Sequence, residues 1–345
     1  MHDVVIIGGG PSGLSAALAL GRARKRVQLC DAGPRRNAAA VHVHNFVTRD
    51  GTPPEEFRRI ARDQLATYAN VAIRDTGVVA IVGERNAFTV QLSAGDEVRA
   101  RRILLATGMV DEMLPIEGFR ELWGHSIFQC PYCHGWEIQD QRWGFLVQAE
   151  HAAHAAPFAL MARGFTTRGL TVFGELPEDV RAQLLAADIA IAAAPVRRLV
   201  ARDGQLAAVE LADGTAVACE ALFVHPPQRQ VALVESLGLA VEDGYLKIDP
   251  MTRETSRPGI YASGDLTTRM QSAIIAAASG MQAAAMINTE LSNLSKRLKY
   301  TFVDLNKYFK GVDGLMEVNY SKDGLHLNTA GYELWMKILK DGKHL

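Results

Sequence analysis

Short apolar runs of strand length alternate along the chain with longer segments of helical character. Near the start, the apolar run Val4–Ile7 is followed by the helical segment Leu14–Gly21 and then by a second run, Val27–Leu29. A strand, a helix and a strand in this order form a βαβ unit, whose strands lie parallel in one sheet. The runs Gly144–Val147 and Leu170–Phe173 predict two strands of a second unit. We therefore expect an α/β fold.

Length and composition limit the classes of protein that this chain can be. Its 345 residues are enough for two domains and an extra piece, and its net charge of −1 favours neither nucleic acid nor an anionic membrane as partner. We expect no transmembrane span and no cleavable leader, because no apolar run reaches bilayer length and Met1 leads straight into a strand. Four cysteines are too few for a secreted disulfide scaffold, so we expect a cytoplasmic protein.

The composition changes abruptly near Ser292. Residues 1–292 are rich in alanine and arginine and contain two lysines, whereas residues 293–345 contain eight lysines, a single alanine and a single arginine. Both parts have the composition of globular protein, so disorder does not explain the change. We interpret the change as a join between segments of different origin.

A glycine-rich segment, Gly-Gly-Gly-Pro-Ser-Gly over residues 8–13, directly follows the first apolar run. Here Gly8 permits a tight turn, Gly10 lets a pyrophosphate approach the backbone, and Gly13 lets the helix pack closely on the sheet. The helix N-terminus adds free N–H groups and partial positive charge. Asp31 follows the second strand, 18 residues after Gly13, where a carboxylate would bind ribose hydroxyls. The pattern predicts a dinucleotide site; the alternative is a glycine-rich turn without a ligand.

A second reactive feature is the sequence Cys-Pro-Tyr-Cys-His over residues 130–134. Two cysteines with this spacing at a helix start form a reversible disulfide, and one thiol of such a pair commonly has a pKa near ~7 or lower. The alternative is half of a zinc site, but no second cysteine pair and no suitable Cys/His pair follows. We expect Cys130 and Cys133 to be a redox dithiol without metal, and Cys30 and Cys219 to be small core residues.

Three further segments complete a family resemblance. One apolar strand ends in Thr107-Gly108, another ends in Ser263-Gly264-Asp265, and Asn45 stands in a His-Asn-Phe turn. With the glycine-rich segment and the dithiol, these resemble the signatures of the low-molecular-weight thioredoxin reductase family over residues 1–292. The resemblance implies bound FAD, with Asp265 on its ribityl chain, and Gln271 and Asn45 close to its ring. The implied FAD ligands are Gly8, Gly10, Pro11, Ser12, Gly13, Asp31, Asn45, Thr107, Gly108, Gly264, Asp265 and Gln271.

The same resemblance assigns different roles to the two thiols. It implies that Cys133 faces the flavin and that Cys130 is the outer thiol that exchanges with substrate. His134 departs from the thioredoxin reductase pattern, which has an Asp after the second cysteine. A neutral imidazole accepts a proton from an incoming dithiol near neutral pH, which suits oxidation of a substrate. The alternative is a histidine on the helix surface without a catalytic part, and the position of His44 alone assigns it no role.

The predicted second nucleotide domain lacks its own glycine fingerprint. There is no glycine between Gly144 and Gly164, and Glu150 at the expected turn would repel a pyrophosphate. After the next strand stands Glu175, where a 2′-phosphate would need basic residues, although Glu175 could still accept the ribose of NAD. We therefore expect the fold to persist and NADPH binding to be lost. Two nearby histidines, at 151 and 154, lack a third metal ligand, so we expect no metal there.

The tail carries a second resemblance. Its segment Asp323-Gly-Leu-His326, followed by Gly331-Tyr332, resembles the final block of SGNH (GDSL-type) esterases, with a strand over residues 301–305 before it and a helix over 329–339 after it. An Asp–His pair without its serine cannot form an acyl-enzyme, and no nucleophile block precedes it. We interpret the tail as a fused fragment without esterase activity.

Together these features predict an α/β protein with two Rossmann-like, three-layer nucleotide-binding domains. Residues 1–111 and 236–292 form a discontinuous FAD domain, residues 112–235 form an inserted, degenerate NAD(P)-type domain that carries the dithiol, and residues 293–345 form a short α/β tail.

The predicted function is FAD-dependent oxidation of a small dithiol by a homodimer, with O2 reduced to H2O2, as in the oxidases that form the gliotoxin and holomycin disulfides. One alternative is a thioredoxin reductase supplied by ferredoxin or NADPH, with thioredoxin as partner. The other is a flavin-binding or interaction protein without catalysis.

Overall fold

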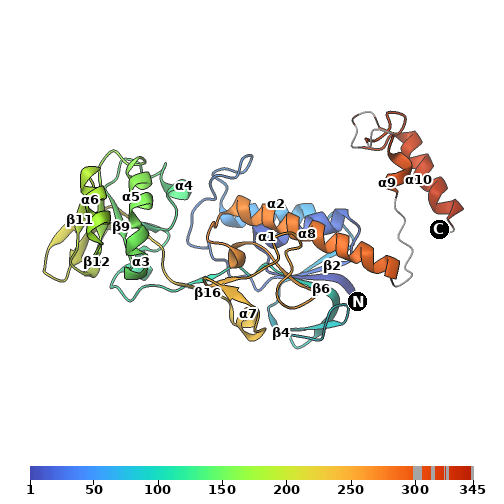
Figure 1. The fold of residues 1–345 in the computed structure, drawn as a ribbon, viewed down its shortest axis with the longest axis horizontal. Coiled ribbons are helices and arrows are strands. Elements are labelled where there is room, and N and C mark those ends of the chain that lie inside the picture. Colours follow the sequence, from blue (N-terminus) through green and yellow to red (C-terminus); the bar gives the residue numbers. More distant parts are fainter. Residues whose placement is uncertain (298–304, 312–314, 322, 324–325, 343–345) are drawn as a thin grey trace. The chain divides into compact units, whose positions relative to one another are not determined.

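The computed structural model describes residues 1–297, 305–311, 315–321, 323 and 326–342 (Figure 1). They belong to two units, Met1–Ile287 and Asn288–Leu345, which we describe separately. Within these ranges, none of the helices combines the length and the apolar character that a membrane crossing requires.

The first unit is organised around a sheet whose parallel part has the strand order β3-β2-β1-β6-β19. Its strands are β1 (His2–Ile7), β2 (Val27–Cys30), β3 (Val71–Arg74), β6 (Glu97–Leu105) and β19 (Ile260–Ala262). The long strand β6 also pairs antiparallel with β5 (Phe88–Leu92), which continues to β4 (Val78–Val82). The expected parallel βαβ unit at the N-terminus is confirmed, since β1 and β2 pair in parallel on either side of α1 (Pro11–Arg22).

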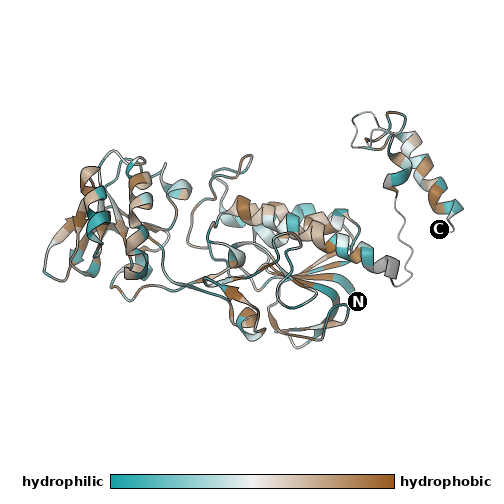
Figure 2. Ribbon diagram, viewed as in Figure 1, coloured by the Kyte–Doolittle hydropathy of each residue, from teal (hydrophilic) through white to brown (hydrophobic). Residues whose placement is uncertain are grey.

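Helices α1, α2 (Pro54–Leu65) and α8 (Ala273–Arg297) cover one face of this sheet (Figure 1). On the other face, apolar side chains of β1 and β6 pack against those of β4, β5 and α7 (Ala232–Ser236). Helix α8 carries both hydrophobic and hydrophilic residues, as a helix with one buried face requires (Figure 2). The result is a three-layer domain.

The chain leaves this domain at β7 (Val110–Asp111) and returns at β16 (Gln228–Arg229), and the two short strands pair antiparallel. The prediction assigned residues up to 235 to the insert. However, Val231, Leu233 and Val234 pack into the core of the first domain. The return therefore lies a few residues earlier, because the apolar side chains that follow β16 belong to that core.

The insert is a second three-layer domain, built on a fully parallel sheet of order β11-β10-β9-β15-β8. Its strands are β8 (Ile127–Phe128), β9 (Trp143–Leu146), β10 (Leu170–Phe173), β11 (Ala190–Ala192) and β15 (Ala221–Val224). Apolar side chains of α5 (Ala155–Arg163) and α6 (Glu178–Ala186) fill one face. The other face packs against α3 (Phe119–Leu122) and a small antiparallel sheet of β12 (Val196–Arg202), β13 (Gln205–Leu211) and β14 (Ala216–Ala218).

The smaller elements of the first unit are α4 (Pro131–His134), the 3-10 helices η1 (Ala149–His154) and η2 (Asp265–Thr267), and the strands β17 (Val241–Glu242) and β18 (Tyr245–Leu246). In the second unit, the structure describes α9 (Asn306–Phe309) and α10 (Thr329–Asp341). Helix α10 confirms the helix expected there. The strand expected over residues 301–305 falls almost entirely outside the described residues.

Candidate active site

The glycine-rich segment forms the turn between β1 and α1, and its geometry requires glycine. Gly8 has φ +112°, and a side chain there would collide with the backbone carbonyl of Ala106, the residue that follows β6. A side chain at Gly13 would collide with the carbonyl of Gly8, so its absence lets α1 start against the turn. Gly10 differs, because no atom lies within 4 Å of the place where its Cβ would be. The turn is therefore tight against the sheet and open on the side of Gly10.

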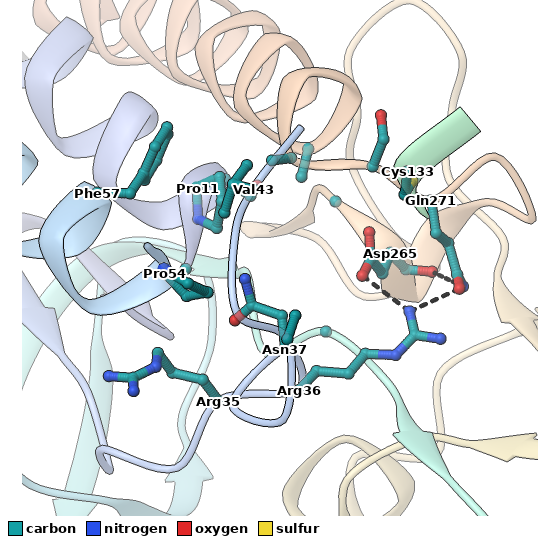
Figure 3. A pocket seen from close by; sticks show the side chains of 18 of the residues that line it. Pro11, Arg35, Arg36, Asn37, Val43, Pro54, Phe57, Cys133, Asp265 and Gln271 are labelled. Carbon is teal, nitrogen blue, oxygen red and sulfur yellow. Dashed lines mark hydrogen bonds and ion pairs between the residues drawn. The ribbon is translucent and has the colours of Figure 1, made fainter. Parts of the chain in front are cut away.

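One cavity begins at this turn and extends to the dithiol (Figure 3). It brings together side chains from both domains, including all but two of the predicted site residues. Those that line it are Gly8, Gly10, Pro11, Ser12, Asp31, Thr107, Gly108, Cys130, Cys133, His134, Gly264, Asp265 and Gln271.

The two exceptions are Gly13 and Asn45, which do not line the cavity. Gly13 serves the close packing of α1. Asn45 lies at the contact between the domains, where its Nδ2 donates a hydrogen bond to the carbonyl of Tyr132, between the two cysteines. Its backbone has φ +58°, a left-handed conformation that asparagine tolerates better than most residues. The structure thus gives Asn45 a contact with the dithiol segment, whereas the resemblance implied one with the flavin ring.

A largely buried arginine, Arg36, connects the FAD side of this cavity to the dithiol segment, and no sequence pattern predicted this role. Arg36 lies in the loop after β2, and its side chain is 18% exposed. Its Nε and Nη2 donate to the two carboxylate oxygens of Asp111, both at 2.7 Å. Its Nη1 donates to Asp265 at 2.9 Å and to Gln271 at 2.6 Å, and its Nη2 donates to Gln129 at 2.9 Å. In Figure 3 the guanidinium points toward Asp265 and Gln271.

The electrostatics of this cluster favour the charged guanidinium. Burial opposes the charge, yet the hydrogen bonds that Arg36 donates to Asp111 and Asp265, and the negative charge of these carboxylates, raise the pKa of Arg36. The pKa of Asp265 is raised, because its burial outweighs the single bond from Arg36. Asp111, with two bonds and 6% exposure, is therefore the stronger partner. No sequence motif marks Arg36, Asp111 or Gln129; only the position of Gln129 directly before Cys130 draws attention to it.

The cavity fits a dinucleotide cofactor in several respects. The open side of Gly10 leaves room beside the first turn of α1, where free backbone N–H groups favour a pyrophosphate. The hydroxyl of Thr107 is buried, and its oxygen has no hydrogen-bond partner among the residues that the structure describes. Asp31 stands at the end of β2 and contacts the guanidinium of Arg58. These groups would hold the phosphates and a ribose of FAD, with Asp265 and Gln271 farther along the cavity.

The dithiol begins the short helix α4, and its two thiols are not equivalent. The S–H of Cys133, followed by the backbone N–H groups of Cys133 and Tyr132, stabilises the thiolate of Cys130 and lowers the pKa of Cys130 to about 7, although burial opposes the shift. The same hydrogen bond and burial raise the pKa of Cys133. The reduced site therefore holds a thiolate at Cys130 and a thiol at Cys133 near neutral pH. Cys30 and Cys219 are buried, and burial raises their pKa to about 11 and about 12.

His134 ends α4 and is held as a neutral base. Its ring stacks on Phe128, with centroids 4.4 Å apart and planes at 24°. Burial lowers the pKa of His134, although the carbonyl of Cys130 and the carboxylate of Glu137 oppose the shift. Its Nδ1 is buried, and no described residue hydrogen-bonds to it. The imidazole is thus neutral at physiological pH and lines the same cavity as the dithiol.

At the turn after β9, where a second glycine fingerprint would bind a nucleotide, the chain carries residues with long side chains. After β9 the chain forms η1 instead of a glycine turn. The Nε2 of Gln148 donates to the carbonyl of His225, and the Nε2 of His151 lies 3.3 Å from Nη2 of Arg269. His154 and Glu150 are exposed. In the described part of the chain, no three His, Cys, Asp or Glu side chains form a group that could hold a metal.

The tail contains the pair that its sequence suggested. Nδ1 of His326 lies 2.7 Å from Oδ2 of Asp323, and the His326 side chain is 81% exposed. The hydroxyl of Ser321 donates to Oδ1 of Asp323 at 3.0 Å. This serine contacts the acid of the pair, whereas a nucleophile would contact the base.

One family model matches the parts of the chain that carry the glycine turn and the dithiol. Residues 2–153 and 171–280 match the model of the pyridine nucleotide-disulphide oxidoreductases. The chain belongs to this family.

Related proteins agree with the family assignment. Thioredoxin reductase sirT from Leptosphaeria maculans is 33% identical over 307 residues, which are 84% of this chain and 94% of that protein. The solved structure of HlmI is 35% identical, covers 86% of this chain and 95% of its own, and has a TM-score of 0.78. The putative thioredoxin reductase TrxB from Bacillus anthracis is 32% identical, covers 85% and 99%, and has a TM-score of 0.79.

Membership of the pyridine nucleotide-disulphide oxidoreductases fixes the cofactor and the class of chemistry. The chain is a flavin-dependent disulfide oxidoreductase of the thioredoxin reductase type, and its cofactor is FAD. The resemblance to the thioredoxin reductase family and the predicted pair of Rossmann-like domains are thereby confirmed.

Replacing Arg36 by Met should destabilise the protein, because it leaves the largely buried carboxylates of Asp111 and Asp265 without their cation. We expect a loss of about 3 kcal/mol in the free energy of unfolding at neutral pH, measured by urea unfolding of the flavin-free protein. The loss should shrink as the pH falls and the carboxylates take up protons.

Arg35→Met is the matched control for this substitution. Arg35 is the neighbouring residue and contacts Glu55, whose side chain is 64% exposed, so we expect a loss below about 1 kcal/mol. Equal losses for the two variants would contradict the role given to Arg36.

The reduced dithiol should react at one thiol. We expect iodoacetamide to alkylate Cys130 with a half-maximal rate near pH 7, and Cys133 to stay unmodified, as followed by peptide mass spectrometry. Cys133→Ala removes the S–H donor and should raise the midpoint for Cys130 by about one pH unit. An unchanged midpoint in Cys133→Ala would show that another group stabilises the thiolate.

Proposed function

We propose that this flavoprotein is a dithiol oxidase that forms a disulfide in a small dithiol and reduces O2 to H2O2. The observation that carries the proposal is the asymmetric dithiol beside a neutral histidine in the FAD cavity. The proposal includes the homodimeric state and the cytoplasmic location that the sequence predicts.

The chemistry of the thiols supports oxidation of a substrate. A substrate thiolate attacks Sγ of Cys130 in the Cys130–Cys133 disulfide; the new S–S bond forms, the old one breaks, and Cys133 leaves. In this mixed disulfide Cys130 is not a thiolate, and burial, which raises the pKa of Cys133, favours uptake of one proton by Cys133. The second substrate thiol then displaces Cys130, which leaves as a thiolate because its pKa is about 7. Bound FAD supplies the two-electron acceptor for the reduced dithiol and the route to O2.

The turn at Gln148 supports a role without NADPH. A pyrophosphate at this turn would have to displace the bond between Gln148 and the His225 carbonyl and approach the carboxylate of Glu150. The absence of glycine between Gly144 and Gly164 leaves no bare backbone for it. Electrons from a dithiol avoid this requirement.

A second candidate is a thioredoxin reductase that receives electrons from NADPH or ferredoxin and delivers them to thioredoxin. The names of its relatives sirT and TrxB favour it, because both are called thioredoxin reductases. It uses the same dithiol with the electron flow reversed, so one set of assays separates the two candidates.

The test compares electron donors with the purified holoprotein. Dithiothreitol should bleach the flavin anaerobically and support O2 uptake with H2O2 release in air. NADPH should bleach the flavin at least about 100-fold more slowly, because the insert offers no formed site for its pyrophosphate. Flavin bleaching by NADPH at the rate of turnover, with reduction of thioredoxin, would establish the second candidate instead.

The cysteine variants provide the control for the chemistry. Cys130→Ser and Cys133→Ser should each abolish dithiol turnover while the flavin absorbance stays at the wild-type level, since neither thiol is needed to hold FAD. Wild-type O2 uptake in both variants would rule out the dithiol mechanism.

We propose that the tail brings no esterase activity, because the described residues offer Asp323 and His326 no serine on the side of the base. Ending the chain after Ser292 should leave flavin content and dithiol oxidation within about twofold of wild type, as a surface change would. Hydrolysis of p-nitrophenyl acetate should be absent from both forms. Hydrolysis that disappears in His326→Ala would make the chain bifunctional.

A further inference from the structure

A second histidine reaches the dithiol cavity from the first domain. His44 lies in the loop between β2 and α2 and lines the same cavity as Cys130, Cys133 and His134. Its side chain is 16% exposed. Its Nδ1 lies 3.5 Å from Oδ1 of Asp50, and its Nε2 lies 3.5 Å from Oε1 of Glu137. The imidazole is therefore held between a carboxylate of its own loop and one that follows α4.

The loop around His44 is fixed against the dithiol segment. Val43 and Thr52 pair antiparallel and close the loop. Asp50 also accepts a hydrogen bond from the backbone N–H of Asn45 at 2.7 Å. Asn45 in turn binds the carbonyl of Tyr132, between the two cysteines. These contacts set the position of the His44 ring relative to α4.

Four titratable side chains surround His44. Asp50 and Glu137 face its two nitrogens, and His42 contacts its ring with centroids 5.9 Å apart. His134 is the fourth: His44 lowers the pKa of His134, whereas Glu137 raises it. The carboxylate of Glu137 thus interacts electrostatically with both imidazoles, that of His44 from the first domain and that of His134 from the insert.

The proton balance of dithiol oxidation leaves one proton for a base at the site. A substrate dithiol brings two thiol protons to the enzyme disulfide. Cys133 retains one, because its pKa is raised, and Cys130 leaves without one near neutral pH. One proton per reaction must therefore pass to a base. His134 can accept it, but burial lowers the pKa of His134, so it holds the proton weakly and must pass it on.

We propose that His44, oriented by Glu137, is the proton acceptor of the dithiol site that completes this transfer. The inference rests on the proposed dithiol oxidation, since the reverse reaction would use the same pair as a proton donor. Because His44 belongs to the first domain and Glu137 to the insert, the pair exists only where the loop meets the dithiol segment. Imidazoles exchange protons near neutral pH, as this step needs.

The experiment must distinguish a proton acceptor at His44 from a purely structural role of this residue in holding the loop. A clamp that only held the loop would affect the reaction equally at every pH. A proton acceptor would matter most where the substrate thiols are protonated and least where they ionise without help.

The experiment measures anaerobic bleaching of the flavin by dithiothreitol in the full-length holoprotein between pH 6 and pH 9.5. We expect His44→Gln to slow the reaction about 100-fold at pH 7, and its rate to rise about tenfold per pH unit toward the wild-type rate. Glu137→Gln should show a smaller loss with the same pH trend. His154→Gln, the same substitution at an exposed histidine of the insert, should keep the wild-type profile.

Two further measurements keep the result unambiguous. Imidazole added to His44→Ala should restore much of the rate at pH 7. Alkylation of Cys130 by iodoacetamide should keep its wild-type extent in His44→Gln, which shows that the dithiol is intact. A loss in His44→Gln that is equal at every pH, a wild-type profile, or no rescue by imidazole would overturn the inference. If wild-type flavin is not reduced by the dithiol at all, the proposed function itself fails.

Discussion

The largely buried cation Arg36 joins the two domains of this flavoprotein beside the dithiol. Arg36 is bound by Asp111 on the crossing strand β7, by Asp265 at the end of the cavity and by Gln129 beside the dithiol. An unpaired charge in such a site is costly, so the contacts with Arg36 favour the arrangement in which the three segments lie together. The side chain of Gln228 on β16 extends the cluster by donating to Asp111. Both crossing strands therefore take part in the bonds that hold the dithiol segment beside the FAD cavity.

The asymmetry of the dithiol arises within the segment Cys130–Cys133 itself and from its burial. Cys130 collects hydrogen bonds from the backbone of α4 and from Cys133, and the two thiols share their protons unequally as a result. A thiolate at Cys130 leaves easily, which suits the step of the proposed oxidation that releases the substrate disulfide. The neutral His134 in the same cavity agrees with that direction, because an imidazolium could not accept a proton.

The sequence predicted those parts of the site that depend on local spacing. The turn at Gly8–Gly13 with its strands, and the dithiol at the start of a helix, follow from patterns within a few residues, whereas the strand β8 before the dithiol was not predicted. Arg36 could not be predicted, because its partners lie 75, 93 and 229 residues away and share no pattern with it. The expected place of Asn45 came from a resemblance, and here its amide binds the backbone of the dithiol segment instead of lining the cavity. Long-range polar contacts therefore account for what the sequence left out.

The insert keeps its fold without a nucleotide fingerprint because its core does not depend on the fingerprint. Trp143 at the start of β9 is almost fully buried, and its indole N–H donates to the carbonyl of Ile138 at 2.9 Å, just after the dithiol helix. Phe165, which follows α5, contacts Tyr132 edge to face. The core of the insert thus reaches α4 directly, and substitutions at the turn around Gln148 leave that support intact. The insert therefore supports the dithiol helix through its own core, independently of any ligand at the turn around Gln148.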